Sequence, residues 1–253
     1  MPETHVTTLT GRTAVVTGGA SGIGAAIATQ LAEQGALVVV LDRDGEAAAK
    51  LAAAIHGDFR AVDLTDAEAI DALDLQADIL VNNAGFQHVA PIEEFDPEQF
   101  RRMHRLMLEA PFLLARRMLP GMYERGFGRI VHVSSVHGHR ASPYKSAYVS
   151  AKHGLEGLSK VIALEGADKG VTSNTVCPGY VRTALVEGQL ADQASAHDID
   201  EDEVLDQVLL ARTPVKRLVE PQEVAEMVTF LCGVGAQSIT GSSFLLDGGW
   251  TAA

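Results

Sequence analysis

Three residues in one stretch of the chain could carry out proton transfer: Ser135, Tyr148 and Lys152. The serine precedes the tyrosine by thirteen residues, and the tyrosine precedes the lysine by four. On a helix, residues four apart share one face, and an ammonium group beside a phenol favours the ionised phenolate. In a partly desolvated cleft, this pair would make Tyr148 a usable proton acceptor near neutral pH. The alternative is a surface tyrosine and lysine on an ordinary helix, and the pair alone does not decide between the two.

The elements that would position these residues alternate along the chain between apolar, β-rich runs and helical stretches. This alternation predicts an α/β fold: a single Rossmann-like, doubly wound parallel sheet of about seven strands with helices on both faces. One domain would span 1–253, and the polar, acidic segment at about 185–212 is interpreted as an inserted helical substrate lid. The expected strands are Thr13–Thr17, Leu37–Leu41, Phe59–Val62, Ile79–Asn82, Arg129–Ser134, Val171–Val176 and Ser243–Leu246. The expected helices lie near 23–34, 44–55, 66–73, 96–124, 146–167 and 221–233.

Composition excludes several functional classes. The net charge of −13 over 253 residues argues against general binding to nucleic acid or to an anionic membrane. Two cysteines give no disulfide framework, and there is no signal peptide or membrane-spanning run, so a cytoplasmic protein is expected. No metal is expected either, because seven of the histidines fit no metal-ligand spacing. These are His5, His56, His88, His104, His132, His153 and His197.

A glycine-rich turn at 17–24, T-G-G-A-S-G-I-G, follows the first predicted strand and opens the first predicted helix. Glycines let backbone N–H groups approach a pyrophosphate at a helix N-terminus. The second predicted strand is followed directly by Asp42, which could hold the adenosine ribose hydroxyls and would repel the 2′-phosphate of NADP. Arg43 could accommodate that phosphate, and either the turn or the aspartate alone could be structural. Together they favour NAD.

The chain resembles the short-chain dehydrogenase/reductase family over nearly its whole length. Besides the glycine turn and the Ser–Tyr–Lys set, the shared motifs are V-D-L at 62–64, N-N-A-G at 82–85, P-G-Y-V-R-T at 178–183 and D-G-G at 247–249. The resemblance implies a homotetramer and NAD bound by Gly18, Ser21, Gly22, Ile23, Gly24, Asp42, Asp63, Leu64, Asn83, Tyr148, Lys152, Val181 and Thr183. Two single members have structural alternatives: Asn82 could tie strands together, and Thr183 could cap the lid helix.

The resemblance also implies catalytic roles. Tyr148 would exchange a proton with the substrate hydroxyl. Lys152 would lower the pKa of Tyr148 and hold the nicotinamide ribose, and Ser135 would stabilise the developing alkoxide or carbonyl oxygen. One position departs from the family: Met107 stands where relatives carry an asparagine that supports a water-mediated proton relay to the lysine. A thioether is a poor relay partner, so a backbone carbonyl with water, or another route, would have to serve. Pro111 in the same helix is expected to kink it locally.

A cationic loop in an acidic protein indicates the substrate. The loop between Ser135 and Tyr148 carries four basic residues, and its two outer members, His137 and Lys145, can face the crevice beside the catalytic set. His139 and Arg140 are interpreted as solvated. Within the family, the chain is similar to the D-3-hydroxybutyrate dehydrogenases. That similarity implies a small anionic hydroxy-acid or keto-acid substrate bound by Gln87, Ser135, His137, Lys145, Tyr148, Gln189 and Trp250.

The expected function is therefore reversible, NAD-dependent oxidation of (R)-3-hydroxybutyrate to acetoacetate, with Tyr148 as general base and acid. Two alternatives stay open. A 3-oxoacyl reductase would share the catalytic set but would not need groups that bind a carboxylate. A nucleotide-sensing protein would keep the fold without catalysis, since fold does not imply function, and Met107 is the only residue that favours this reading.

Overall fold

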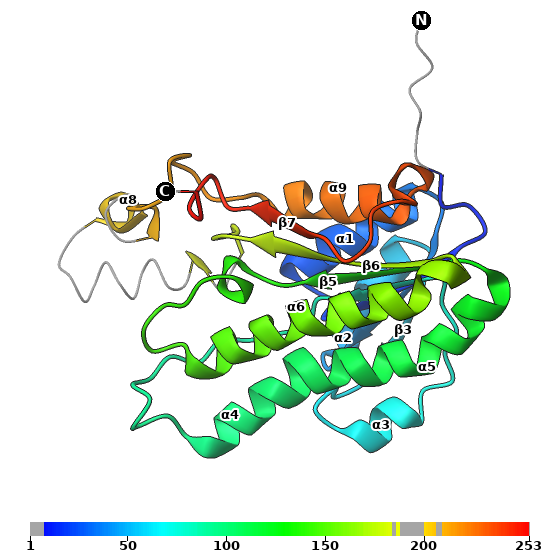
Figure 1. The fold of residues 1–253 in the computed structure, drawn as a ribbon, viewed down its shortest axis with the longest axis horizontal. Coiled ribbons are helices and arrows are strands. Elements are labelled where there is room, and N and C mark those ends of the chain that lie inside the picture. The colour runs from blue at the N-terminus through cyan, green and yellow to red at the C-terminus, as the bar shows by residue number, and fades with distance from the viewer. Residues whose placement is uncertain (1–7, 184–185, 188–199, 206–208, 253) are drawn as a thin grey trace, which may run out of the picture.

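The computed structural model describes residues 8–183, 186–187, 200–205 and 209–252. Seven parallel strands form one sheet in the order β3-β2-β1-β4-β5-β6-β7 (Figure 1). The order reverses between β1 and β4, where open parallel sheets form a crevice at the carboxyl ends of their strands. This confirms the predicted Rossmann-like architecture. The strands are β1 (Thr13–Thr17), β2 (Leu37–Asp42), β3 (Asp58–Ala61), β4 (Ile79–Asn82), β5 (Gly128–Val133), β6 (Val171–Pro178) and β7 (Ser243–Leu246).

The strands coincide with the β-branched, apolar runs of the sequence, and every predicted strand overlaps an observed one. β4, β5 and β6 are buried along their whole length. Strands of a parallel sheet that is covered on both faces read as continuous apolar runs, not as alternating ones. β3 stands at one edge of the sheet and is exposed.

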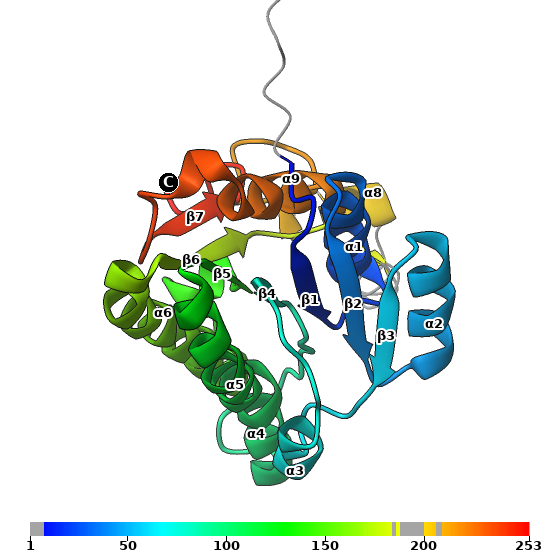
Figure 2. The same cartoon turned by 90° about the vertical axis from the view of Figure 1, so that its right-hand side faces the viewer.

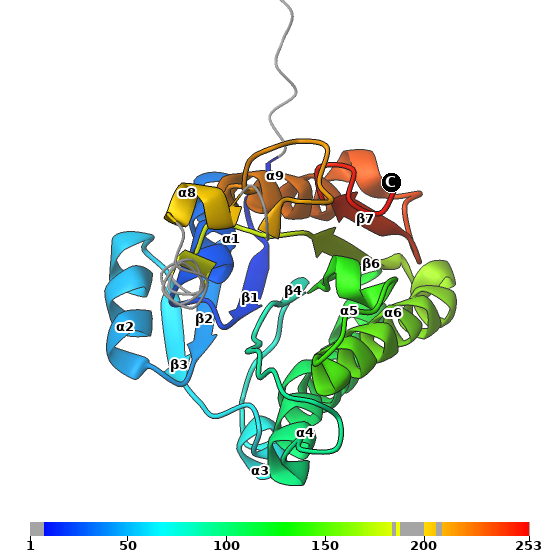
Figure 3. The same ribbon diagram turned by 90° about the vertical axis from the view of Figure 1, so that its left-hand side faces the viewer.

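Two layers of helices enclose the sheet, as Figures 2 and 3 show from opposite sides. One layer packs against β1 and β2 in the first apolar core and consists of α1 (Gly22–Glu33), α2 (Gly45–Ala54) and α9 (Pro221–Cys232). The other layer packs against the opposite face in the second apolar core and consists of α3 (Ala67–Asp71), α5 (Ala110–Arg125) and α6 (Ser146–Gly166). Helices therefore cover both faces of the sheet, as predicted.

The long helix expected at 96–124 is divided into three parts. α4 (Pro97–His104) leads into a π-helical segment, η1 (Arg105–Glu109), which continues as α5. Pro111 lies in the first turn of α5, so the irregularity precedes the proline instead of lying at it. Because Pro111 has no backbone N–H and its ring crowds the carbonyl four residues earlier, the carbonyl of Met107 lacks its α-helical partner. A widened π turn accommodates this gap.

Part of the predicted lid at 185–212 is described. It contains the short helix α8 (Glu201–Val204), and Val186, Val204 and Leu209 pack with Tyr180 in a small apolar cluster. Gln189 lies outside the described residues. None of the helices in the described part of the chain is long and apolar enough to cross a membrane.

Candidate active site

A cavity of about 760 Å³ is lined by residues that follow the carboxyl ends of β1, β2, β4, β5 and β6. This is where the reversal of strand order predicts a ligand site. Of the predicted site residues that the structure describes, all except Gly24 line this cavity. The structure therefore brings together residues from motifs spread between positions 18 and 250.

The glycine turn is shaped by close backbone contacts. Gly18 and Gly22 have positive φ angles of 58° and 52°, a conformation that favours glycine. A Cβ on Gly18 would lie 2.8 Å from the Cα of Ala84, and a Cβ on Gly24 would collide with the carbonyl of Gly18. Gly24 thus serves the packing of α1 against the turn, while Gly18 and Gly22 face the cavity. The turn ends at Ser21, the N-cap of α1, so the helix N-terminus points at the cavity.

The glycine turn and the N-N-A-G loop after β4 together form what we call the cradle. Side chains link the loop to the turn. Asn83 donates through Nδ2 to the carbonyls of Thr17 and Gly18, at 3.0 Å each. The hydroxyl of Thr17 accepts hydrogen bonds from the backbone N–H groups of Asn83 and Ala84, at 2.9 and 3.0 Å. Asn82 is buried and its Nδ2 lies 3.2 Å from Nδ1 of His132, so it links β4 to β5.

Asp42 ends β2 with its carboxylate fixed by the backbone. Its Oδ2 accepts from the N–H of Ala20 and its Oδ1 from the N–H of Asp44, both at 3.0 Å. The carboxylate is therefore held beside the glycine turn, on the wall of the cavity, and Arg43 lines the same wall. Further along this wall, Asp63 accepts from the N–H and the hydroxyl of Thr65, and these hydrogen bonds lower the pKa of the Asp63 carboxyl.

The three residues of the Ser–Tyr–Lys set line the same cavity. Tyr148 and Lys152 lie one turn apart on α6, as predicted, and Nζ of Lys152 is 5.6 Å from the centroid of the Tyr148 ring. Lys152 is buried and donates to the carbonyl of Val133 at the end of β5, at 2.7 Å. Ser135 follows β5, and its Oγ accepts from the N–H of His137 at 3.1 Å.

The pKa values of this set differ in one respect from the expectation. Burial raises the pKa of Tyr148, and the Ser135 hydroxyl acts in the opposite direction without reversing the shift. Burial also lowers the pKa of Lys152 to about 8. The predicted lowering of the Tyr148 pKa by Lys152 is therefore not present in this arrangement, because the ammonium group is directed at the Val133 carbonyl and burial dominates.

At the predicted substrate end, the Lys145 ammonium group lies between the rings of His137 and Tyr180. Nζ of Lys145 lies 3.2 Å from Nε2 of His137 and 5.8 Å from the centroid of the Tyr180 ring. Burial lowers the pKa of His137 to about 4, and the charge of Lys145 acts in the same direction. His137 is therefore neutral near pH 7, and since the ammonium group donates to Nε2, the ring proton belongs on Nδ1. The His137 ring meets the rings of Tyr148 and Trp250 edge to face, with centroids 6.1 and 5.9 Å apart.

The other predicted substrate residues lie around this pair. Gln87 is half-buried on the cavity wall, and the N–H of Ala90 donates to the carbonyl of Tyr144 at 3.0 Å, which ties its segment to the Lys145 loop. Trp250 follows β7 in a turn held by Asp247, whose carboxylate accepts from the N–H groups of Gly249 and Thr251.

Sequence reasoning missed three contributors to the site. Thr17 shapes the cradle through its hydroxyl, Asp247 forms the turn before Trp250, and Tyr180 faces Lys145. Thr17 and Asp247 stand inside the quoted motifs, so their motif positions were the available signal. Tyr180 also stands inside a quoted motif, P-G-Y-V-R-T, but its distance from Lys145 in the sequence gave no sign of the contact.

Met107 fills the predicted relay position with apolar packing. It is buried in a cluster with Met103, Ala147 and Ala151, against which Tyr148 packs. Its Sδ would lie 3.2 Å from a Cβ on Gly85, so the thioether packs closely on the N-N-A-G loop. The side chain therefore offers packing, and no polar group, at this point.

Comparison with known proteins agrees with this geometry. A family model described as Enoyl-(Acyl carrier protein) reductase matches residues 18–251. An uncharacterized oxidoreductase, YxjF, of Bacillus subtilis (strain 168) is 45% identical, covering 94% of this chain and 98% of the relative. D-beta-hydroxybutyrate dehydrogenase of Rhizobium meliloti (strain 1021) is 43% identical, covering 95% and 99% respectively.

A solved structure agrees equally well. The crystal structure of L-sorbose reductase from Gluconobacter frateurii, complexed with NADPH and L-sorbose, matches with a TM-score of 0.90 at 32% identity. The match covers 98% of this chain and 99% of that chain. Together with the Ser–Tyr–Lys geometry and the glycine cradle, these matches establish that the chain belongs to the short-chain dehydrogenase/reductase family of oxidoreductases.

Proposed function

We propose that this oxidoreductase oxidises (R)-3-hydroxybutyrate to acetoacetate with NAD, reversibly. The observation that carries the proposal is the Lys145–His137 pair, which puts a half-enclosed cation beside Tyr148 in the same cavity. A cation among aromatic rings suits a small carboxylate, because a charge-assisted hydrogen bond strengthens away from water. The relative from Rhizobium meliloti named D-beta-hydroxybutyrate dehydrogenase supports the same assignment.

The residues of the cavity fit a dinucleotide. At Gly18 the backbone passes close to Ala84 and carries no side chain, and α1 begins beside it. The backbone N–H groups at this helix N-terminus therefore form a site for an anion such as a pyrophosphate. When bound, the nicotinamide ring accepts or supplies the hydride. The chain's own residues then hold the reacting oxygen: Tyr148 takes the hydroxyl proton during oxidation and returns it during reduction, and Ser135 donates to the same oxygen.

The preference for NAD rests on Asp42. Its carboxylate is fixed by two backbone N–H groups, so it cannot swing away to admit another anion without losing them. A 2′-phosphate beside it would meet a like charge. Arg43 on the same wall would favour the phosphate.

The proton leaves Tyr148 by a route that does not need the Met107 side chain. Lys152 reaches one backbone carbonyl already, that of Val133. The carbonyl of Met107 lacks its α-helical partner because Pro111 follows four residues later. We infer that this carbonyl, with water, takes the place of the polar side chain in the relay.

The deciding experiment follows NADH absorbance while the protein is mixed with (R)-3-hydroxybutyrate and NAD. We expect turnover with this enantiomer, little with the (S)-enantiomer, and a higher kcat/KM with NAD than with NADP. Methyl (R)-3-hydroxybutyrate, which lacks the charge, is the matched control for the carboxylate. Equal turnover of acid and ester would contradict the role of Lys145. Turnover only of NADPH with oxoesters or neutral ketoses would replace the proposal with a reductase of another substrate class.

A further inference from the structure

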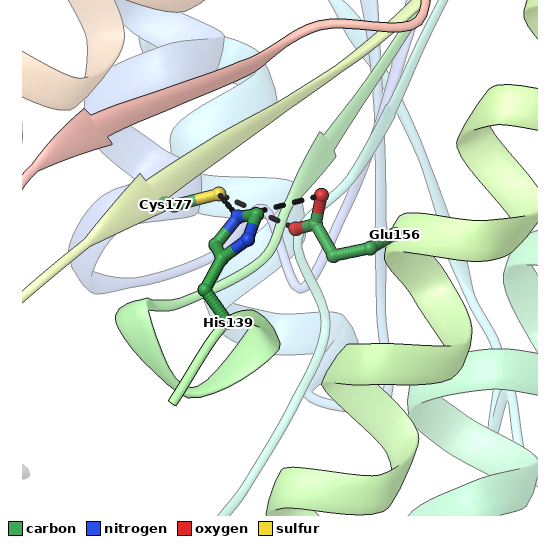
Figure 4. Close-up of side chains that lie close together, drawn as sticks. All are labelled: His139, Glu156 and Cys177. Atoms are coloured by element: carbon green, nitrogen blue, oxygen red, sulfur yellow. Dashed lines mark hydrogen bonds and ion pairs between the residues drawn. The ribbon is translucent and has the colours of Figure 1, made fainter. Parts of the chain in front are cut away.

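We propose that His139, Glu156 and Cys177 form a binding site for a zinc-type divalent transition-metal ion outside the hydride-transfer cavity. Figure 4 shows the three side chains converging from different elements: the loop after the 3-10 turn η2 (Val136–Gly138), helix α6 and strand β6. None of the three lines the cavity described above. Their ligand atoms all lie within 4.8 Å of one another.

The spacing of the donor atoms suits one tetrahedral ion. Zinc bonds of about 2.0–2.1 Å to nitrogen, about 2.3 Å to sulfur and about 2.0–2.2 Å to oxygen put the donor atoms roughly 3.4–3.6 Å apart at the tetrahedral angle. In this structure, Nε2 of His139 lies 3.6 Å from Sγ of Cys177 and 3.7 Å from Oε2 of Glu156. Sγ of Cys177 lies 3.3 Å from Oε1 of Glu156. The last two distances end on different oxygens of the carboxylate, so an ion bound through one oxygen requires the His139 ring or the carboxylate to shift, starting from donor separations that are all within 4.8 Å.

The carboxylate is already oriented as a metal ligand would be. Oε2 of Glu156 accepts from the hydroxyls of Thr175 and Ser243, at 2.8 and 2.7 Å. Oε1 accepts from the Cys177 thiol, which must lose its proton to bind a metal. Metal binding would thus expose lone pairs on Oε1 while the two hydroxyls keep the carboxylate in place, the arrangement that outer-shell partners give ligands in metal sites.

The buried charge of Glu156 also favours a bound cation. Glu156 is only 5% exposed and Cys177 is fully buried, and a buried carboxylate is costly unless it is paired or coordinates a metal. Without the ion, Cys177 holds its proton, since its Sγ donates to Oε1 of Glu156. Binding the ion releases that proton to solvent and leaves a thiolate, an imidazole and a carboxylate around a dication. Imidazole and thiolate favour zinc, copper or nickel over magnesium or calcium.

An ion has a path to this position. His139 was interpreted from the sequence as solvated; its side chain is 33% exposed and forms the outer wall of the cluster. Gly138 lets the loop pass directly over the carboxylate, since a Cβ there would lie 2.9 Å from Oε1 of Glu156. A bound ion would fasten the loop that carries Ser135, His137 and Lys145 to α6 and β6.

The test measures metal binding directly in the full chain. We expect zinc to bind with one ion per chain by calorimetry, after dialysis against chelator, and to raise Tm. Cobalt in place of zinc should give the near-ultraviolet absorbance band of a thiolate–cobalt bond. His139→Ala, Glu156→Gln and Cys177→Ser should each weaken zinc binding by roughly 100-fold or more, since even outer-shell partners are worth 10- to 100-fold.

Matched controls separate this site from adventitious binding. Cys232→Ser removes the other buried cysteine. His153→Ala removes a histidine on α6, the helix that carries Glu156. Both should keep wild-type affinity. His139→Ala changes a partly exposed loop residue, so it also tests the site if a buried variant fails to fold. Binding that is unchanged in His139→Ala, a cobalt complex without the thiolate band, or no zinc uptake at all would each overturn the proposal.

Discussion

The two halves of the cavity are built in different ways. The cradle proposed for the cofactor is shaped mainly by backbone: glycines that approach other chain segments closely, the start of α1, and loops fixed by Thr17 and Asn83. The substrate end is made of side chains that arrive from separate segments, with Lys145 and His137 on one loop and Trp250 after β7. A backbone cradle suits a cofactor shared by many enzymes, whereas side chains can change from one substrate to another.

The largest effect is expected where the two halves meet, at Tyr148. Replacing it with phenylalanine removes the only proposed proton acceptor for the substrate hydroxyl, so kcat should fall by roughly 100- to 10,000-fold. NAD affinity, measured by calorimetry, should stay close to wild type because the cradle is untouched. Tyr144→Phe changes an exposed tyrosine on the loop before α6 and serves as the control. Substantial turnover by Tyr148→Phe would contradict the proton-transfer role.

The next effect isolates the substrate end. Lys145→Ala should raise KM for (R)-3-hydroxybutyrate by roughly 10- to 100-fold, since a hydrogen bond to a charged group contributes about 1.5–3 kcal/mol. KM for NAD and kcat should change much less, because Lys145 faces His137 and Tyr180 and not the glycine turn. Lys160→Ala, on the exposed side of α6, is the control. An unchanged KM would remove Lys145 from the carboxylate site.

A smaller effect isolates the cofactor half. Asp42→Ala should reduce the preference for NAD over NADP by roughly tenfold, which corresponds to about 1.4 kcal/mol. The loss should lie mainly in better use of NADP, because the repelling charge has gone. Measuring kcat/KM for both cofactors at saturating substrate gives the ratio, with Asp44→Ala as a neighbouring control. The same ratio in Asp42→Ala and wild type would show that Asp42 does not discriminate.

The smallest expected effect concerns pH. Burial raises the pKa of Tyr148, so the fraction able to accept a proton grows as the pH rises. kcat/KM for oxidation should therefore increase with pH through neutrality, because the raised pKa keeps most of the Tyr148 phenol protonated there. Reduction, which needs the protonated tyrosine, should slow over the same interval. Oxidation that is independent of pH through neutrality would disagree with this assignment.

The sequence predicted the cofactor half of the cavity better than the contacts between distant segments. The strands and the cofactor cradle were predictable because each depends on local signals: apolar runs, a glycine turn, and a strand ending in Asp42. The π segment was missed because periodicity cannot distinguish a widened turn from a regular one. The meeting of Lys145 with Tyr180, and of His139 with Glu156 and Cys177, depends on contacts between distant segments that no spacing encodes. Of the residues assigned by family resemblance, those that the structure describes line the cavity, apart from Gly24.

The strand order also bears on how the molecule assembles. β1 pairs with β4, and β6 with β7, so neighbours in the sheet come from well-separated parts of the chain and pair slowly. During synthesis the N-terminal part of a chain emerges first, and the first four strands with their cradle are complete at Gly85. Trp250 can reach His137 only after β7 has joined β6. The part of the molecule that assembles last is therefore the part that we propose binds the substrate.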